Sequence, residues 1–285
     1  MTSQGSFIRA GLLVFLLPFL IWILFLFVIP HVELLRFSFL GHRTGTFTLA
    51  NYTKFFAQEL YRNTFLRTAI FSIIATLITM IVSFPIAFFV TKFVGVGKRS
   101  ILMLIIIIPF WISELIRAFA WMTLLRETGT ISYLLQLSGL TSQNVELLYN
   151  DAAIMVGLVY ASMLFMIVPI ASTISTLDDN IIEAAYDLGG SFFSTMREVI
   201  IPYAAPGIAT GCIVVFMINL GNLITVTLLG GKDSLWFTEL IYNQFIIRFN
   251  WNQGSAFGFL LLSLSTLIVW IGLKVTGQEL SKVLK

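Results

Sequence analysis

The sequence predicts an all-α protein that crosses a membrane with six helices. Apolar residues make up 58% of the 285 residues and charged residues only 11%, whereas soluble domains carry roughly a quarter of charged residues. The mean hydropathy is +0.95. Six stretches have the roughly 20 apolar residues that a helix needs to cross a bilayer, and a backbone in lipid must be helical to satisfy its own hydrogen bonds. The composition therefore excludes a soluble globule, a disordered chain and a disulfide framework.

The six spans are expected to form a single transmembrane domain over residues 1–285. The first apolar run, at about 11–30, is too long for a signal-peptide core and has no small-residue cleavage site behind it, so we interpret it as a retained span. The other five spans, each expected to be one helix, lie at about 68–90, 100–125, 152–175, 204–229 and 256–275.

Six spans place both chain termini on the same side of the membrane. Lysines and arginines are almost evenly divided between the two sides, but the tight turn with Lys92, Lys98 and Arg99 and the short basic tails favour cytoplasmic termini, since short segments count most in the positive-inside rule. This orientation puts the substantial loop 176–203 in the cytoplasm.

Several functions are excluded by the composition. The net charge is +3 without a basic block, so nucleic-acid binding has no electrostatic basis. One cysteine, Cys212, and two histidines, His31 and His42, leave no disulfide, nearly exclude a metal site and suggest no catalytic triad. The glycines before Lys98 do not have P-loop spacing. We therefore expect no catalytic residues and no metal in this chain.

The loop 176–203 has the pattern of two short helices. Asn180 followed by Glu183 resembles a capping box, and the pair Gly189-Gly190 predicts the end of the first helix. Ser191 is expected to cap a second helix, which Pro202 ends before the membrane resumes. The loop is unusually apolar for a solvated connection, with Ile182, Ala185, Tyr186, Phe192, Phe193 and Met196.

Two interpretations of this apolar loop stay open on physical grounds. An exposed apolar surface usually marks a protein partner, but the loop would also suit an amphipathic connector among lipid headgroups. The small side chains of Ala184 and Ala185 beside the glycine pair favour close approach to a folded surface.

Polar residues inside the predicted spans are candidates for a translocation pathway, because each is costly there. Glu114 lies about 14 residues into the third span, after a bend expected at Pro109. It either pairs with Arg117 one turn later or meets a cation. Further candidates would line a passage or hydrogen-bond between helices: Ser113, Tyr160, Asn219 and Asn222, with Trp111 as a platform for an organic cation.

The loop resembles the EAA motif of ABC importer permeases. Glu183-Ala184-Ala185, Gly189 and Val199-Ile200-Ile201-Pro202 have the matching spacing, with Val for Ile and Ile for Leu as the departures. Phe47–Tyr52 is similar to a segment common in the outer loop of these permeases. Ile108–Arg117 and Leu228–Gly231 look most like the B-type permease subunit of the spermidine/putrescine branch.

The resemblance implies a six-helix type I permease that is not itself an enzyme. It implies a second permease subunit as heterodimer partner, an ATP-binding subunit dimer that carries ATP and Mg, and an extracytoplasmic solute-binding protein, all at a bacterial inner membrane. No cofactor is implied for this chain. The coupling residues would be Glu183, Ala184, Ala185, Gly189, Gly190 and Pro202, and the substrate a polyamine.

Other functions are weighed against this one. Related branches of the family carry opines, phosphonates, thiamine or iron. A gradient-driven secondary transporter would show an internal repeat or paired helix breaks, which the sequence does not reveal, and a scaffold protein would have no reason to carry the spaced loop motif.

Overall fold

The computed structural model describes residues 15–42, 44–232 and 234–275. Within these ranges the chain is helical and holds no β-strand beyond an isolated bridge between Leu40 and Phe47. Two compact units can be distinguished: unit 1 comprises Met1–Arg62 and Leu240–Ser263, and unit 2 comprises Asn63–Glu239 and Leu264–Lys285. Each unit is described by itself.

Among the described residues, five continuous helices are long and apolar enough to cross a membrane. The number reaches the predicted six if the pair of helices Gly97–Trp111 and Glu114–Leu137, bent by 90°, counts as one broken span. The start of the first predicted span, residues 11–14, lies outside the described residues. The five continuous spans are Phe15–Ser38, Glu59–Phe93, Asp151–Ser175, Phe192–Leu220 and Trp251–Lys274.

Unit 1 is joined by amide side chains that reach across its helices. It contains η1 (Leu24–Val28), α2 (Ile29–Ser38), α3 (Ala50–Ala57), η5 (Asn243–Ile247) and the first part of α14 (Trp251–Val275). The Asn51 side chain donates to the carbonyls of Ser38 and Leu40, both at 2.9 Å, and Gln253 Nε2 donates to the Asn51 carbonyl at 2.8 Å. These bonds satisfy backbone groups where helices end inside the unit.

Unit 2 is built around the long helix α8. Its elements are most of α4 (Glu59–Phe88), η2 (Phe89–Phe93), α5 (Val96–Ile107), η3 (Ile108–Trp111), α6 (Glu114–Leu125), α7 (Thr130–Leu137), α8 (Asp151–Ser175), α9 (Asp179–Asp187), α10 (Phe192–Thr195), η4 (Met196–Ile200), α11 (Ile201–Leu220), α12 (Ile224–Leu229), the first residues of α13 (Phe237–Tyr242) and the last turns of α14.

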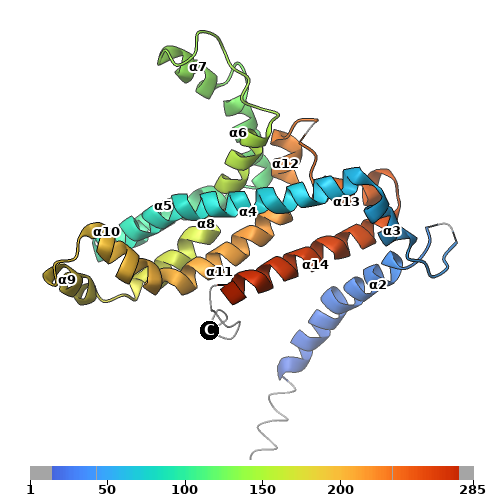
Figure 1. Cartoon of the computed structure of the whole chain (residues 1–285), viewed down its shortest axis with the longest axis horizontal. Helices are drawn as coiled ribbons and strands as arrows, with labels where there is room; N and C mark the ends of the chain where they lie inside the picture. Colours follow the sequence, from blue (N-terminus) through green and yellow to red (C-terminus); the bar gives the residue numbers. More distant parts are fainter. Residues whose placement is uncertain (1–14, 43, 233, 276–285) are drawn as a thin grey trace, which may run out of the picture. The chain divides into compact units, whose positions relative to one another are not determined.

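The core of unit 2 lies where α11 packs along α8 (Figure 1). Ile167, Ile170 and Ile174 of α8 are fully buried there. A Cβ atom at Gly207 would lie 2.5 Å from the Pro169 carbonyl oxygen, and one at Gly211 would lie 2.6 Å from the Met166 sulfur. The two glycines therefore permit the close helix contact that small residues give in membranes.

The loops of unit 2 gather at two opposite ends of α8. At its C-terminal end, Lys92 Nζ donates to the Leu177 carbonyl at 2.6 Å and to Asp179 Oδ1 at 2.5 Å. At its N-terminal end, Asp151 forms an ion pair with Arg67 and accepts a hydrogen bond from Ser234 Oγ at 2.7 Å. The turn after α4 and the α9–α10 segment thus share one end, as the predicted alternation of spans requires.

Two spans are interrupted, and the expectation of continuous helices at 100–125 and 204–229 is wrong. The third span stops in the 3₁₀ turn η3, continues through Ile112 and Ser113 in extended conformation, and restarts as α6 in a new direction (Figure 1). Pro109 has no amide hydrogen to continue the α-helical bonds. The fifth span ends at Leu220, and α12 follows only after Gly221, Asn222 and Leu223.

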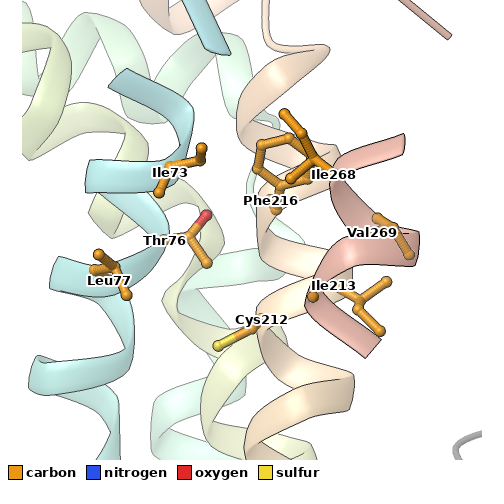
Figure 2. Close-up of a pocket in the computed structure, with 9 residues that line it drawn as sticks. Ile73, Thr76, Leu77, Cys212, Ile213, Phe216, Ile268 and Val269 are labelled. Atoms are coloured by element: carbon orange, nitrogen blue, oxygen red, sulfur yellow. The ribbon is translucent and has the colours of Figure 1, made fainter. Parts of the chain in front are cut away.

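An apolar groove of about 160 Å³ lies between α4, α11 and the last turns of α14 (Figure 2). Ile73, Phe216 and Ile268 contribute to its walls. The hydroxyl of Thr76, which also lines it, donates to the Ser72 carbonyl at 2.7 Å. The groove has no charged residue in its lining and does not suit a charged substrate.

Candidate functional site

The first candidate site is the loop between α8 and α11, whose first helix is α9. The predicted cap at Asn180 is wrong: the helix begins at Asp179, and the Asp178 side chain accepts from the Asn180 N–H at 3.0 Å. An aspartate cap also places negative charge beside the positive end of the helix. Glu183 therefore lies too far into the helix to complete a capping box, and its side chain is exposed.

The predicted role of the glycine pair in ending α9 is confirmed. Gly189 has φ +84°, in the left-handed region that favours glycine. Its N–H donates to the Tyr186 carbonyl at 2.9 Å, and the N–H of Gly190 donates to the Ala185 carbonyl at 3.0 Å, which is the pattern of a Schellman motif. A Cβ atom at Gly190 would lie 2.6 Å from the Ala185 oxygen. Both glycines are therefore fixed by the geometry of the turn.

The second helix of the loop begins as predicted and ends differently. The Ser191 hydroxyl accepts from the Ser194 N–H at 3.2 Å and caps α10. The helix does not end at Pro202 but runs continuously from Phe192 to Leu220. The π-helical segment η4 directly before Ile201 accommodates Pro202, which has no N–H to donate. The loop is thus joined rigidly to the fifth span.

The loop exposes apolar side chains, although not all of those predicted. Ile182 and Met196 pack against the core of unit 2 and anchor the two helices to it. Tyr186, Phe192 and Phe193 are exposed as expected. Leu188 is 89% exposed and was not among the predicted apolar residues, although its position directly before the glycine pair was a signal for it.

The second candidate site lies where the two interrupted spans meet. Glu114, the first residue of α6, accepts hydrogen bonds at Oε1 from Asn222 Nδ2 at 2.7 Å and from Thr225 Oγ1 at 3.3 Å. Asn222 Oδ1 in turn accepts from the Thr225 N–H at 3.0 Å. Asn222 and Thr225 are 6% and 2% exposed. The breaks therefore bring a carboxylate to a partly buried polar cluster.

Arg117 does not pair with Glu114 in the part of the chain that the structure describes. Its guanidinium carbon lies 4.6 Å from the centre of the Phe110 ring and 6.0 Å from that of Tyr160, which is the geometry of a cation–π contact. The Phe110 and Tyr160 rings are stacked with centroids 6.1 Å apart, and Trp121 meets Tyr160 edge-on at 5.6 Å. We call Phe110, Trp121 and Tyr160 the aromatic cluster.

The predicted pathway residues are only partly brought together. Glu114 and Tyr160 line one small cavity of about 10 Å³ together with Arg117, Trp121 and Thr225. Trp111 is 88% exposed and Ser113 is exposed at the break. Asn219 is fully buried, and its side-chain amide has no hydrogen-bond partner among the described residues.

Sequence reasoning missed Phe110 and Thr225, although a signal existed for both. Phe110 follows Pro109 and Thr225 follows the Gly221-Asn222 pair, so each lies next to residues that interrupt helices. An apolar groove of about 300 Å³ is lined by Trp121, Tyr160 and residues of α4 and α8. The carboxylate cavity and this groove share the two rings.

Comparison with protein families identifies the class. Residues 55–275, which include the α9–α10 loop and both breaks, match the family model described as the inner membrane component of binding-protein-dependent transport systems. The chain belongs to this family. It is a permease subunit of an ABC importer.

Similar proteins agree with this assignment over nearly the whole permease. It is 33% identical to the spermidine/putrescine transport system permease protein PotB of Haemophilus influenzae, with 88% of each chain covered. It is 31% identical to the PotB protein of Escherichia coli, with 90% of this chain and 96% of the relative covered. A crystal structure of a bacterial ABC transporter that imports alginate has a chain of the same fold, at a TM-score of 0.81 and 18% identity over 97% and 98% of the two chains.

Membership of the family establishes the location of the protein and the division of labour with the ATPase. The permease is a multi-pass inner membrane protein without its own catalytic centre, and a separate chain carries the ATPase. The sequence revealed no paired helix breaks, which would have favoured a secondary transporter, whereas the structure has two interrupted spans. Membership of the importer family, rather than helix continuity, separates the two classes.

Proposed function

We propose that this permease forms half of the translocation pathway of an ATP-driven polyamine importer. The observation that carries the proposal is the carboxylate of Glu114 at the joined breaks of two spans, beside the aromatic cluster. A carboxylate and ring faces are the groups that attract an organic ammonium. The 300 Å³ apolar groove that shares Trp121 and Tyr160 suits the methylene chain between amines. The names of the similar permeases support the same substrate class.

The family and the exposed surfaces support a proposal for the assembly. We propose a heterodimer with a second permease, a dimer of ATP-binding subunits that hold ATP and Mg, and an extracytoplasmic solute-binding protein. The apolar side chains of the α9–α10 loop, such as Leu188 and Phe193, would be covered by an ATP-binding subunit. The two units belong to one permease domain over residues 1–285, with both termini in the cytoplasm.

Reconstituted uptake tests the substrate and the energy source together. The complete complex in proteoliposomes should take up radiolabelled spermidine and putrescine only with ATP inside and binding protein outside, and a proton uncoupler should not reduce uptake. Excess unlabelled polyamine should compete, while opines, phosphonates, thiamine and ferric iron should not. Uptake driven by an ion gradient without ATP, or competition by one of these other solutes, would contradict the proposal.

A further inference from the structure

The guanidinium of Arg117 lies over an aromatic ring, and two of its nitrogens have no hydrogen-bond acceptor among the described residues. A guanidinium in a membrane span is expected to be held by carboxylates or carbonyls, because it carries five N–H donors and a full charge. Here it lies over the face of Phe110, with Tyr160 on a second side. Within the described residues, Nε and Nη1 are buried and have no hydrogen-bond partner. The two ring faces are therefore the contacts that the structure shows for this guanidinium.

The carboxylate of Glu114, on the same helix, is hydrogen-bonded to other residues. Glu114 is three residues before Arg117, a spacing at which the two side chains are neighbours. Both hydrogen bonds to Glu114 end on Oε1, from Asn222 and Thr225, and no donor among the described residues reaches Oε2. A cation and an anion that are well placed to pair are thus held separately, each with unused hydrogen-bonding capacity.

We propose that Arg117 is a resident cation that fills the ammonium-binding face of the aromatic cluster until a substrate amine displaces it. The inference rests on the proposed function, because it assigns the site at which a substrate amine binds. An incoming primary ammonium would lie against Phe110 and Tyr160 and donate to Oε2 of Glu114. Glu114 and Arg117 are one turn apart on α6, and Glu114, Arg117 and Tyr160 line the same small cavity.

Displacement, rather than joint occupancy, follows from electrostatics. Two cations at one ring face repel strongly where water is largely excluded. An exchange of one cation for another keeps the charge next to Glu114 constant, so the site is never left with an uncompensated carboxylate in the bilayer. Since Nε and Nη1 have no acceptors to lose, the guanidinium leaves at small cost in hydrogen bonds. Arg117 would thereby keep the empty site closed to weakly bound small cations.

The test is direct binding of radiolabelled spermidine to the purified complex without its binding protein. Arg117→Gln removes the competing charge, and its affinity for spermidine should rise about tenfold, the scale of a cation–π contact. Arg117→Lys keeps a cation over the rings and should remain close to the wild type. Arg126→Gln, at the exposed end of the same helix, is the matched control and should not change binding.

Two further variants keep the test decisive. Phe110→Leu in the Arg117→Gln background should abolish the gain in affinity, because it removes the ring face. If Arg117→Gln does not assemble, Arg117→Met keeps the aliphatic stem without the charge and should show the same gain. Unchanged or weaker spermidine binding in an assembled Arg117→Gln or Arg117→Met complex would overturn the inference.

The inference and the proposed function fail in different ways. ATP-driven polyamine uptake by the wild type together with unchanged binding in Arg117→Gln would overturn only the resident-cation role. A wild type that takes up no polyamine, with spermidine binding gained in Arg117→Gln, would support the cation site and contradict the proposed substrate.

Discussion

The Lys92 ammonium lies 2.5 Å from the Asp179 carboxylate and 2.6 Å from the Leu177 carbonyl oxygen. Its side chain is 9% exposed, whereas that of Asp179 is 75% exposed. The lysine is therefore fixed in the turn η2 and holds the first residues of the loop that contains α9. This contact ties the α9–α10 loop to the end of the second span, in addition to its covalent links to the fourth and fifth spans.

Loss of this tie should weaken coupling without preventing assembly. Lys92→Ala is expected to reduce uptake per ATP hydrolysed severalfold, because α9 would then move without carrying α4. Asp179→Asn should have a smaller effect, since exposed ion pairs contribute only about 0–1 kcal/mol and Leu177 would still accept from Lys92. Uptake and ATP hydrolysis measured on the same proteoliposomes give the ratio. Lys98→Ala, an exposed lysine in the neighbouring turn, is the control, and a wild-type ratio in Lys92→Ala would remove Lys92 from the coupling path.

Glu114→Gln should impair uptake by at least about tenfold while the complex still assembles. The glutamine oxygen can still accept from Asn222 and Thr225, so the polar cluster is retained, but the charge that attracts an ammonium is lost. Initial rates of spermidine uptake over a range of concentrations measure the effect. Glu127→Gln, at an exposed position after α6, should behave as the wild type. Normal kinetics in an assembled Glu114→Gln complex would show that the carboxylate is outside the pathway.

Gly157→Val should destabilise the packing of α8 against α12. A Cβ atom at this position would lie 2.4 Å from Leu229 Cδ1 and 2.5 Å from Thr225 Cγ2, so these two side chains must move, and the overpacking should cost about 1–3 kcal/mol. The temperature at which the detergent-solubilised complex loses its monodisperse chromatographic peak should fall by several degrees. Gly258→Val, where a Cβ meets nothing within 4 Å, should leave that temperature nearly unchanged. Equal stability of the two variants would contradict the close packing.

The sequence predicted those features that depend on local chemistry. The spans follow from apolar length, and the end of α9 follows from the two glycines, because only glycine fits the left-handed position at 189. The cap was misplaced by two residues, since both Asp178 and Asn180 are suitable caps and the choice depends on where the loop leaves α8.

The polar cluster could not be predicted, because it depends on tertiary contacts. Pro109 indicated a bend, but nothing local specifies the 90° turn or the meeting of Glu114 with Asn222, which are 108 residues apart. The spacing of Glu114 and Arg117 favoured a pair on one helix face. In the structure, Asn222 in the break before α12 and Thr225 in α12 supply competing donors to the carboxylate, and Phe110 supplies a ring to the cation.

The proposed orientation is tested by cysteine labelling from outside intact cells. Six spans with cytoplasmic termini place Thr46 outside and Ser194 inside. In a Cys212→Ala background, a membrane-impermeant thiol reagent should therefore label Thr46→Cys and leave Ser194→Cys unlabelled until the cells are permeabilised. The reverse pattern would invert the topology and place the α9–α10 loop on the wrong side for an ATPase.

The central claim is that the α9–α10 loop passes the movement of the ATPase to the membrane spans, and Gly189→Asp tests it most directly. A non-glycine residue at φ +84° costs of order 1 kcal/mol, and a carboxylate there adds charge beside the exposed apolar side chains. The measurement is binding-protein-stimulated ATP hydrolysis, followed with uptake in proteoliposomes. Both should fall steeply in Gly189→Asp and in Glu183→Lys. Both should persist in Gly95→Asp, where φ is −58° and no atom lies within 4 Å of the added Cβ. Wild-type stimulation and uptake in both loop variants would mean that the loop is a passive connector, and would contradict the account.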